Sequence, residues 1–140
     1  MPAKVFVDTN LWLYALVAND NDPRHQIAAE FILGLKRPWI NSQVIREASS
    51  NLLKKAKIAE TRLRAIIQDW YRDCEIHPSN ASQHRLASEL RERYAFSYWD
   101  SLIVAAALDA GCSTLFSEDM QHGLYINGSL TILNPFMDRA

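Results

Sequence analysis

Glycine and cysteine are scarce in this chain, and neither sign of charge dominates it. With four glycines in 140 residues, the chain has no GxGxxG or Walker-type glycine loop, which disfavours dinucleotide and P-loop sites. The two cysteines, Cys74 and Cys112, form no CxxC pair and are too few for a disulfide framework. We therefore expect two buried free thiols.

Long hydrophobic runs are missing as well. The longest apolar stretches, residues 11–18 and 102–108, are far shorter than the roughly 20 residues of a membrane helix. Residues 1–4 lead straight into a short strand, which leaves no signal-peptide core. We expect a cytoplasmic protein without a membrane partner.

Other common sites are disfavoured in the same way. The formal net charge of -1 gives no signature of a nucleic-acid binder, so such a role would depend on local patches. The four histidines show no HxxxH or HExxH spacing, which disfavours zinc. The GxSxG elbow of α/β-hydrolases does not occur either.

Short apolar strands alternate with amphipathic helices along the chain. Strands are predicted at 5–7, near 39–40, and at 74–76, 113–116 and 130–133. Helical patterns cover 11–18, 23–35, a stretch capped by Ser42, 61–71, 79–94 and a stretch capped by Ser97. This alternation predicts one α/β domain over residues 1–140, with a central parallel sheet of four to five strands and helices on both faces.

The first strand ends at a carboxylate. Asp8 follows Val5, Phe6 and Val7 and is followed at once by Thr9 and Asn10. Proteins of the α/β class build their sites beyond the carboxyl ends of strands, so this position favours a functional role. Capping of the next helix is an alternative explanation, because aspartate is a favoured N-cap.

Three later acids occupy comparable positions, and each has a structural alternative. Glu47 lies on a polar helix stripe and has no cation three or four residues away to pair with. Asp100 stands three residues after Ser97, as in a capping box, yet its helix is apolar enough to be buried. Asp119 follows the strand at 113–116, where turn formation also explains an acid.

In a doubly wound sheet all four acids would reach one crevice. Clustered carboxylates repel one another and persist as anions only beside compensating cations. Mg²⁺ or Mn²⁺ suits them, because these ions prefer oxygen ligands and keep waters that leave room for phosphate oxygens. The cluster therefore predicts metal-assisted hydrolysis of a phosphodiester.

The order and spacing of four segments resemble a known family. The segments are VFVDTN at 5–10, SQVIRE at 42–47, YWDS at 98–101 and SEDMQHG at 117–123. Together they look like the PIN-domain ribonucleases, and specifically the VapC-type toxins of bacterial and archaeal toxin–antitoxin pairs. The resemblance implies a PIN-like fold.

The resemblance also implies roles for particular residues. Asp8, Glu47, Asp100 and Asp119 would form the catalytic Mg²⁺ site, supported by Thr9, Asn10 and Ser117. Ser117 stands where the family more often has threonine, which keeps the hydroxyl. The implied activity is Mg²⁺-dependent endoribonucleolytic cleavage of single-stranded RNA, with 5′-phosphate and 3′-hydroxyl products.

Partners follow from the same resemblance. The implied assembly is a homodimer, inhibited by a VapB-type antitoxin whose C-terminal segment covers the site. Trp12, Tyr14 and Trp39 are candidates for the antitoxin groove, with a place in the core as the alternative. Four basic residues are candidates for holding RNA phosphates, which a solvated helix face explains equally well: Arg46, Lys54, Lys55 and Lys57.

Two other functions are weighed against this one. A haloacid-dehalogenase-like phosphatase also places a nucleophilic aspartate after its first strand, but it needs a second aspartate where this chain has Asn10. A catalytically silent PIN scaffold that binds RNA or a protein partner is the non-enzymatic alternative.

Overall fold

The computed structural model describes residues 3–137 and contains strands and helices in alternation. Its elements are β1 (Val5–Val7), α1 (Thr9–Leu16), α2 (Pro23–Leu33), β2 (Trp39–Asn41), α3 (Ser42–Lys54), α4 (Glu60–Asp73), β3 (Glu75–His77), α5 (Ala81–Arg93), α6 (Tyr98–Asp109), β4 (Thr114–Phe116), β5 (Tyr125–Ile126) and β6 (Leu130–Leu133).

The strands form one sheet in the order β3-β2-β1-β4-β6-β5. All neighbours are parallel except β5, which runs antiparallel to β6. The predicted α/β class with a parallel sheet is therefore confirmed, and β5 adds a two-residue edge strand that the sequence pattern did not indicate. Strand order reverses between β1 and β4, and this switch point is where open α/β sheets bind ligands.

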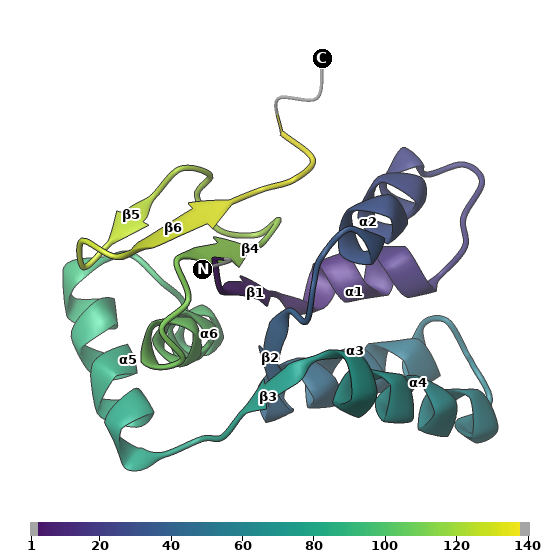
Figure 1. Ribbon diagram of the computed structural model, residues 1–140, viewed down its shortest axis with the longest axis horizontal. Coiled ribbons are helices and arrows are strands. Elements are labelled where there is room, and N and C mark those ends of the chain that lie inside the picture. Colours follow the sequence, from purple (N-terminus) through teal and green to yellow (C-terminus); the bar gives the residue numbers. More distant parts are fainter. Residues whose placement is uncertain (1–2, 138–140) are drawn as a thin grey trace.

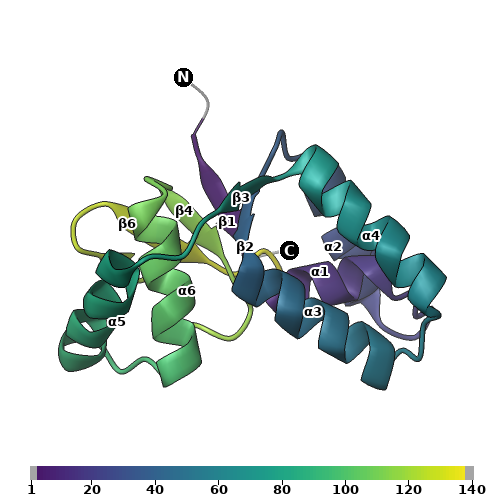
Figure 2. The same ribbon diagram turned by 90° about the horizontal axis from the view of Figure 1, so that it is seen from below.

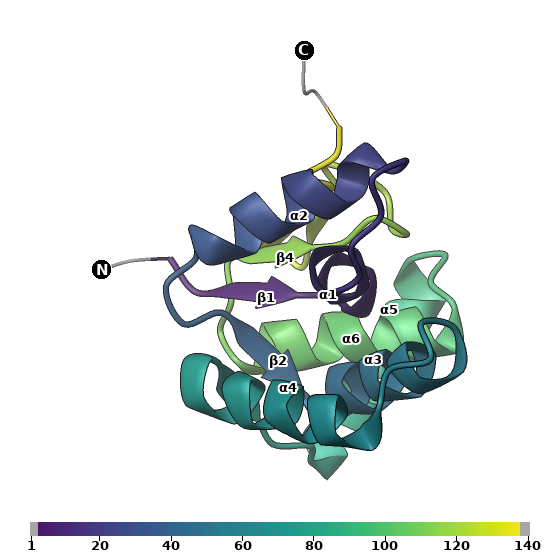
Figure 3. The ribbon, with the colours of Figure 1, turned by 90° about the vertical axis from the view of Figure 1, so that its right-hand side faces the viewer.

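The helices lie on both sides of this switch point. Figures 1 and 2 show α5 and α6 together at one end of the molecule beside β4 and β6, and α1 to α4 gathered at the other end, with β1, β2 and β3 between the two groups of helices. Figure 3 shows α2 on one side of β1 and β4 and α6 on the other. None of the described helices has the length and apolar character needed to cross a membrane.

The core is centred on β1, β4 and α6. Phe6, Leu115 and Val104 are completely buried, and the alanines at 105–107 let α6 pack closely against its neighbours. Cys74 and Cys112 are buried free thiols, as predicted, and burial raises the pKa of each to about 12.

Several helix boundaries differ from the predicted ones. The N-cap of α3 is Asn41 and not Ser42, because β2 extends through Asn41 and its side chain accepts a hydrogen bond from the Val44 N–H at 3.1 Å. Helix α5 likewise begins after Asn80, whose side chain caps the Gln83 N–H. In both places the asparagine satisfies backbone N–H groups that the first helical turn leaves without partners.

Candidate active site

Asp8 lies at the carboxyl end of β1 and is buried, with only 6% of its surface exposed. One carboxylate oxygen accepts a hydrogen bond from the Thr9 backbone N–H at 2.7 Å, so Asp8 does cap α1. The other accepts a hydrogen bond from the Ser117 hydroxyl, just beyond β4, at 2.9 Å. Asp8 therefore joins the two strands on either side of the switch point.

The surroundings of Asp8 disfavour its charged form. Burial raises its pKa from 3.8 to about 6, against the lowering effect of the hydrogen bonds from Thr9 and Ser117. The nearby carboxylates of Asp100 and Glu47 raise it further. A buried acid in this condition binds readily to a cation that restores its charged form.

Glu47 faces the same crevice from α3. One of its oxygens accepts a hydrogen bond from the Thr9 hydroxyl at 3.2 Å, and the other accepts one from the Gln43 side-chain amide at 2.8 Å. Glu47 is half-buried. Its orientation is thus fixed from two sides, by a residue of α1 and by a residue one turn earlier on its own helix.

Asp119 lies in the loop that follows β4. Its carboxylate accepts a hydrogen bond from the Asn10 side-chain amide. Partial burial raises its pKa, with further contributions from Glu118, Asp100 and Glu47. The pKa of Asp119 therefore responds to two of the other three predicted site acids.

Asp100 lies in the first turn of α6, where its backbone N–H donates to the Ser97 hydroxyl at 3.1 Å. Within residues 3–137 its carboxylate forms no hydrogen bond, and the return bond of a capping box is not made. Helix capping therefore uses the backbone of Asp100 and leaves its half-buried side chain available to a ligand.

The four predicted acids lie close together, because Asp100 and Glu47 raise the pKa values of both Asp8 and Asp119. Each supporting residue forms a hydrogen bond with one of these acids. Thr9 bonds to Glu47, Asn10 to Asp119 and Ser117 to Asp8. No Lys or Arg within residues 3–137 forms an ion pair with any of the four acids. Their negative charge is therefore left without a compensating cation in this part of the chain.

The donor atoms of this crevice fit a hard divalent ion. All are carboxylate or hydroxyl oxygens, the ligand type that Mg²⁺ and Mn²⁺ prefer. Among the described residues no three His, Cys, Asp or Glu side chains form a ready metal cage. Mg²⁺ is usually bound through only one or two carboxylates with several retained waters, so an open arrangement suits it.

The predicted basic residues divide into two groups. Arg46 is exposed on α3 and lines the same hollow as Glu47. Lys54, Lys55 and Lys57 are exposed at or beyond the far end of α3. At about 1.5 Å per residue, Lys54 lies roughly 10 Å along the helix from Glu47. Only Arg46 stands beside the acids.

Two contributors were missed by the sequence analysis. Gln43 stands four residues before Glu47, a helical spacing that would have indicated the contact. Glu118 accepts hydrogen bonds from the Tyr14 hydroxyl at 2.8 Å and from Arg24 at 3.2 Å. These bonds tie α1 and α2 to the loop that carries Asp119. Burial and the hydrogen bond to Glu118 raise the pKa of Tyr14 to about 12.

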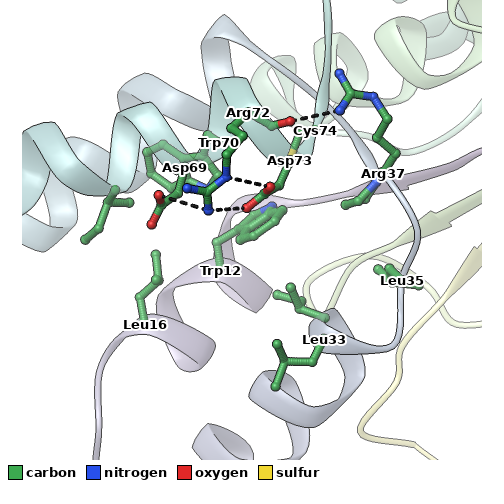
Figure 4. Close-up of a pocket in the computed structure, with 13 residues that line it drawn as sticks. Trp12, Leu16, Leu33, Leu35, Arg37, Asp69, Trp70, Arg72, Asp73 and Cys74 are labelled. Atoms are coloured by element: carbon green, nitrogen blue, oxygen red, sulfur yellow. Dashed lines mark hydrogen bonds and ion pairs between the residues drawn. The ribbon is translucent and has the colours of Figure 1, made fainter.

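A separate apolar groove of about 450 Å³ lies among α1, α2 and α4, and we call it the α1–α4 groove (Figure 4). Leu33 is 86% exposed at its edge, and Trp12, Leu16 and Leu35 line it. Asp69, Asp73 and Arg72 form an ion-paired rim. Of the three predicted groove aromatics only Trp12 lies here.

The other two aromatics are elsewhere. Tyr14 packs edge-on against Phe136 and lies 4.4 Å beneath the Arg24 guanidinium, measured to the ring centroid. Trp39 stacks edge-on with His77, and Lys4 lies over its ring.

A mostly parallel sheet with an acidic crevice at its switch point defines the class of this α/β protein. The PIN domain family matches residues 5–123. The chain belongs to this family. No curated protein gave a significant match.

Solved structures with the same fold include toxins and toxin–antitoxin complexes. A toxin–antitoxin complex from Klebsiella pneumoniae gives a TM-score of 0.72 at 16% identity, covering 96% of this chain and 98% of that chain. Mycobacterium tuberculosis VapC20, described as a sarcin-ricin loop cleaving toxin, gives 0.68 at 19% identity over 83% and 90%. DNA-bound VapBC from Salmonella typhimurium gives 0.68 at 18% identity over 96% and 99%. The resemblance to VapC-type toxins is confirmed at the level of fold.

Proposed function

We propose that this chain is a Mg²⁺-dependent endoribonuclease and the toxin of a VapBC-type toxin–antitoxin system. The observation that supports this most directly is the crevice of Asp8, Glu47, Asp100 and Asp119 on a PIN-family fold, where Asp100 and Glu47 help to raise the pKa values of Asp8 and Asp119 and the four acids lack cationic partners within residues 3–137. The named activity of VapC20 belongs to the same class. Such an enzyme would act in the cytoplasm, where its RNA substrate is found.

The metal site would consist of four carboxylates: Asp8, Glu47, Asp100 and Asp119. Mn²⁺ would serve in place of Mg²⁺. When bound, the ion supplies charge neutralisation at the phosphodiester and a water of lowered pKa. Ser117 and the Thr9 backbone N–H hold the Asp8 carboxylate in position. Gln43 and the Thr9 hydroxyl hold Glu47, and Asn10 orients Asp119.

The reaction is hydrolysis. The water oxygen bonds to phosphorus while the bond from phosphorus to the 3′ oxygen breaks, and the leaving oxygen takes a proton. The products carry 5′-phosphate and 3′-hydroxyl ends. A metal ion binds the ionised form of Asp8. Since the pKa of Asp8 is about 6 in the metal-free protein, ion binding should be favoured at neutral or higher pH.

The deciding assay is cleavage of cellular RNA by the wild type, Asp8→Asn and Asp100→Asn with Mg²⁺ or with EDTA. Cleavage should need the ion and should be lost in both variants. Asp69→Asn changes an exposed acid on α4, and this matched control should cleave RNA normally. Full activity of Asp8→Asn and Asp100→Asn would overturn the site, and binding of RNA without cleavage by the wild type would favour the silent scaffold.

A phosphatase of the haloacid dehalogenase type finds no support in the site. Asn10 occupies the position of the second aspartate and donates a hydrogen bond to Asp119. This position therefore lacks the carboxyl group that would act as general acid in a phosphatase of that type.

The protein partners are part of the same proposal. An apolar segment of a VapB-type antitoxin would bury Leu33 and cover Trp12 in the α1–α4 groove, whose exposed apolar lining suits such a segment. The neighbour from Klebsiella pneumoniae was solved as a toxin–antitoxin complex. We also propose a homodimer, which light scattering on the purified chain tests directly.

A further inference from the structure

Two aromatic side chains stand exposed immediately before Asp100. Trp99 is 62% exposed and Tyr98 is 51% exposed, at the first turn of α6. The other three tryptophans are buried or half-buried. Exposure of aromatic rings forgoes favourable burial, so a pair of adjacent exposed rings beside the acidic crevice indicates a contact made with a ligand.

The position of Trp99 is fixed by the site itself. The Gln43 side-chain amide donates to the Trp99 carbonyl at 3.2 Å and to Glu47 at 2.8 Å. One residue thus connects the backbone of the exposed tryptophan to a site acid. The Trp99 ring meets Tyr98 edge-on at 5.1 Å between centroids, and Arg91 lies 4.9 Å from the centroid of the Tyr98 ring. Tyr98 is therefore in contact with both Trp99 and Arg91 although half of its surface stays exposed, while Trp99 is supported by the Tyr98 ring.

Trp99 lies in the shared lining of two neighbouring hollows. The larger, of about 630 Å³, has Glu47 and Asn51 in its lining, and the smaller, of about 310 Å³, has His84 and Tyr98. Gln43, Arg46 and Trp99 line both. Volumes of this size hold small-molecule groups. A ligand in the larger hollow contacts an aromatic face, a guanidinium and a site acid at once.

We propose that Trp99 is a stacking platform for a base of single-stranded RNA, and that it positions the neighbouring phosphodiester in the acidic crevice. This inference rests on the proposed ribonuclease function and names how its substrate is held. Exposed aromatic rings beside cationic side chains are the means by which proteins grip unpaired bases. Arg46 supplies the cation for a phosphate on the same hollow.

A second copy of the chain is the competing occupant of this surface. The lining of the larger hollow favours RNA, because Arg46 and Ser50 offer polar groups that an apolar interface would leave without partners. Their donors match phosphate and base oxygens, and Glu47 faces the same hollow. The surface therefore suits a polar chain with flat aromatic groups.

The test compares Trp99→Ala and Trp99→Phe with the wild type, using a short unstructured single-stranded RNA in EDTA. Tyr71→Ala removes an equally exposed aromatic from α4, where Tyr71 is 56% exposed, and is the matched control. Wild-type tryptophan emission should be quenched on binding. Trp99→Ala should bind on the order of tenfold more weakly, whereas Trp99→Phe should keep most of the affinity and lose the quenching. With Mg²⁺, Trp99→Ala should raise KM more than it lowers kcat.

The outcomes separate this inference from the proposed function. Cleavage by the wild type with unchanged KM and unchanged quenching in the Trp99 variants would overturn the stacking role and leave the ribonuclease intact. Quenching by RNA without any cleavage would support the stacking role and overturn the ribonuclease. A shift of Trp99→Ala from dimer to monomer in light scattering, with RNA affinity per chain unchanged, would assign the surface to a second copy.

Discussion

Replacing Asp8 by asparagine should stabilise the metal-free protein while it abolishes RNA cleavage. Burial raises the pKa of this carboxyl from 3.8 to about 6, so its ionised form is less favourable in the folded protein than in the unfolded chain. The difference corresponds to about 3 kcal/mol of unfolding free energy at high pH. Asparagine removes this cost because it carries no charge.

The substitution preserves the local contacts. The asparagine oxygen can still accept the hydrogen bond from the Thr9 backbone N–H. Its amide can donate to the Ser117 oxygen, because a hydroxyl group rotates and accepts as readily as it donates. No cavity is created, since the two side chains have the same shape, so the loss of charge is the principal change.

The gain has a defined pH dependence. A folded-state pKa above the unfolded value means that Asp8 favours the folded wild type fully below about pH 3.8 and loses that contribution as pH rises through 6. Asp8→Asn should therefore match the wild type near pH 4 and exceed it in stability above pH 6. The measurement is urea unfolding in EDTA at a series of pH values.

Asp109→Asn is a control of opposite sign. Its hydrogen bond with His77, at 2.7 Å, lowers the pKa of Asp109. That contribution is present above the unfolded pKa and is lost as pH falls through the folded one, so this variant should be less stable than the wild type at pH 8. The reasoning would be refuted if the Asp8→Asn protein were less stable than the wild type at pH 8. It would also be refuted if the gain in unfolding free energy did not change with pH.

Three further substitutions test other parts of the structure. Ser117→Ala removes the hydroxyl donor to buried Asp8 and should lower the unfolding free energy at pH 8 by about 1 to 3 kcal/mol in urea titrations; Ser117→Thr, which keeps the hydroxyl, should not. Gln43→Ala frees the Glu47 carboxylate and should slow RNA cleavage on the order of tenfold at an unchanged melting temperature, and equal rates would contradict that role. Leu33→Asp alters an exposed side chain, so it should leave the melting curve as it is and reduce antitoxin capture in a pull-down; undiminished capture would place the antitoxin elsewhere.

The convergence of the acids was predictable because it depends on strand direction. Asp8 and Asp119 follow parallel strands, and the carboxyl ends of such strands share one edge of the sheet. The periodicity of the helices likewise indicated that the helices carrying Glu47 and Asp100 begin near that edge. A local pattern that repeats along an element is visible in sequence.

The partners of each acid were not predictable in the same way. Ser117 meets Asp8, and Tyr14 meets Glu118, across separations of 109 and 104 residues. Such contacts depend on how helices pack, which periodicity does not specify. The two-residue β5 is too short to show an alternating pattern, and its pairing with β6 depends on the turn between them. For Asp8, the capping explanation and the ligand explanation are compatible, because its two oxygens have different neighbours.

The central place of β1 has a consequence for synthesis of the chain. Strand β1 leaves the ribosome before the other described strands and pairs with β2 and β4, and β4 begins only at Thr114. Ser117 follows Asp8 by 109 residues, and Asp119 follows later still, so neither exists when β1 is made. A nascent chain that ends before β4 therefore carries an unfinished crevice, in which Asp8 lacks its hydrogen bond from Ser117. An enzyme of the proposed kind therefore has a built-in delay, because its crevice is complete only after the residues that follow β4 have been synthesised.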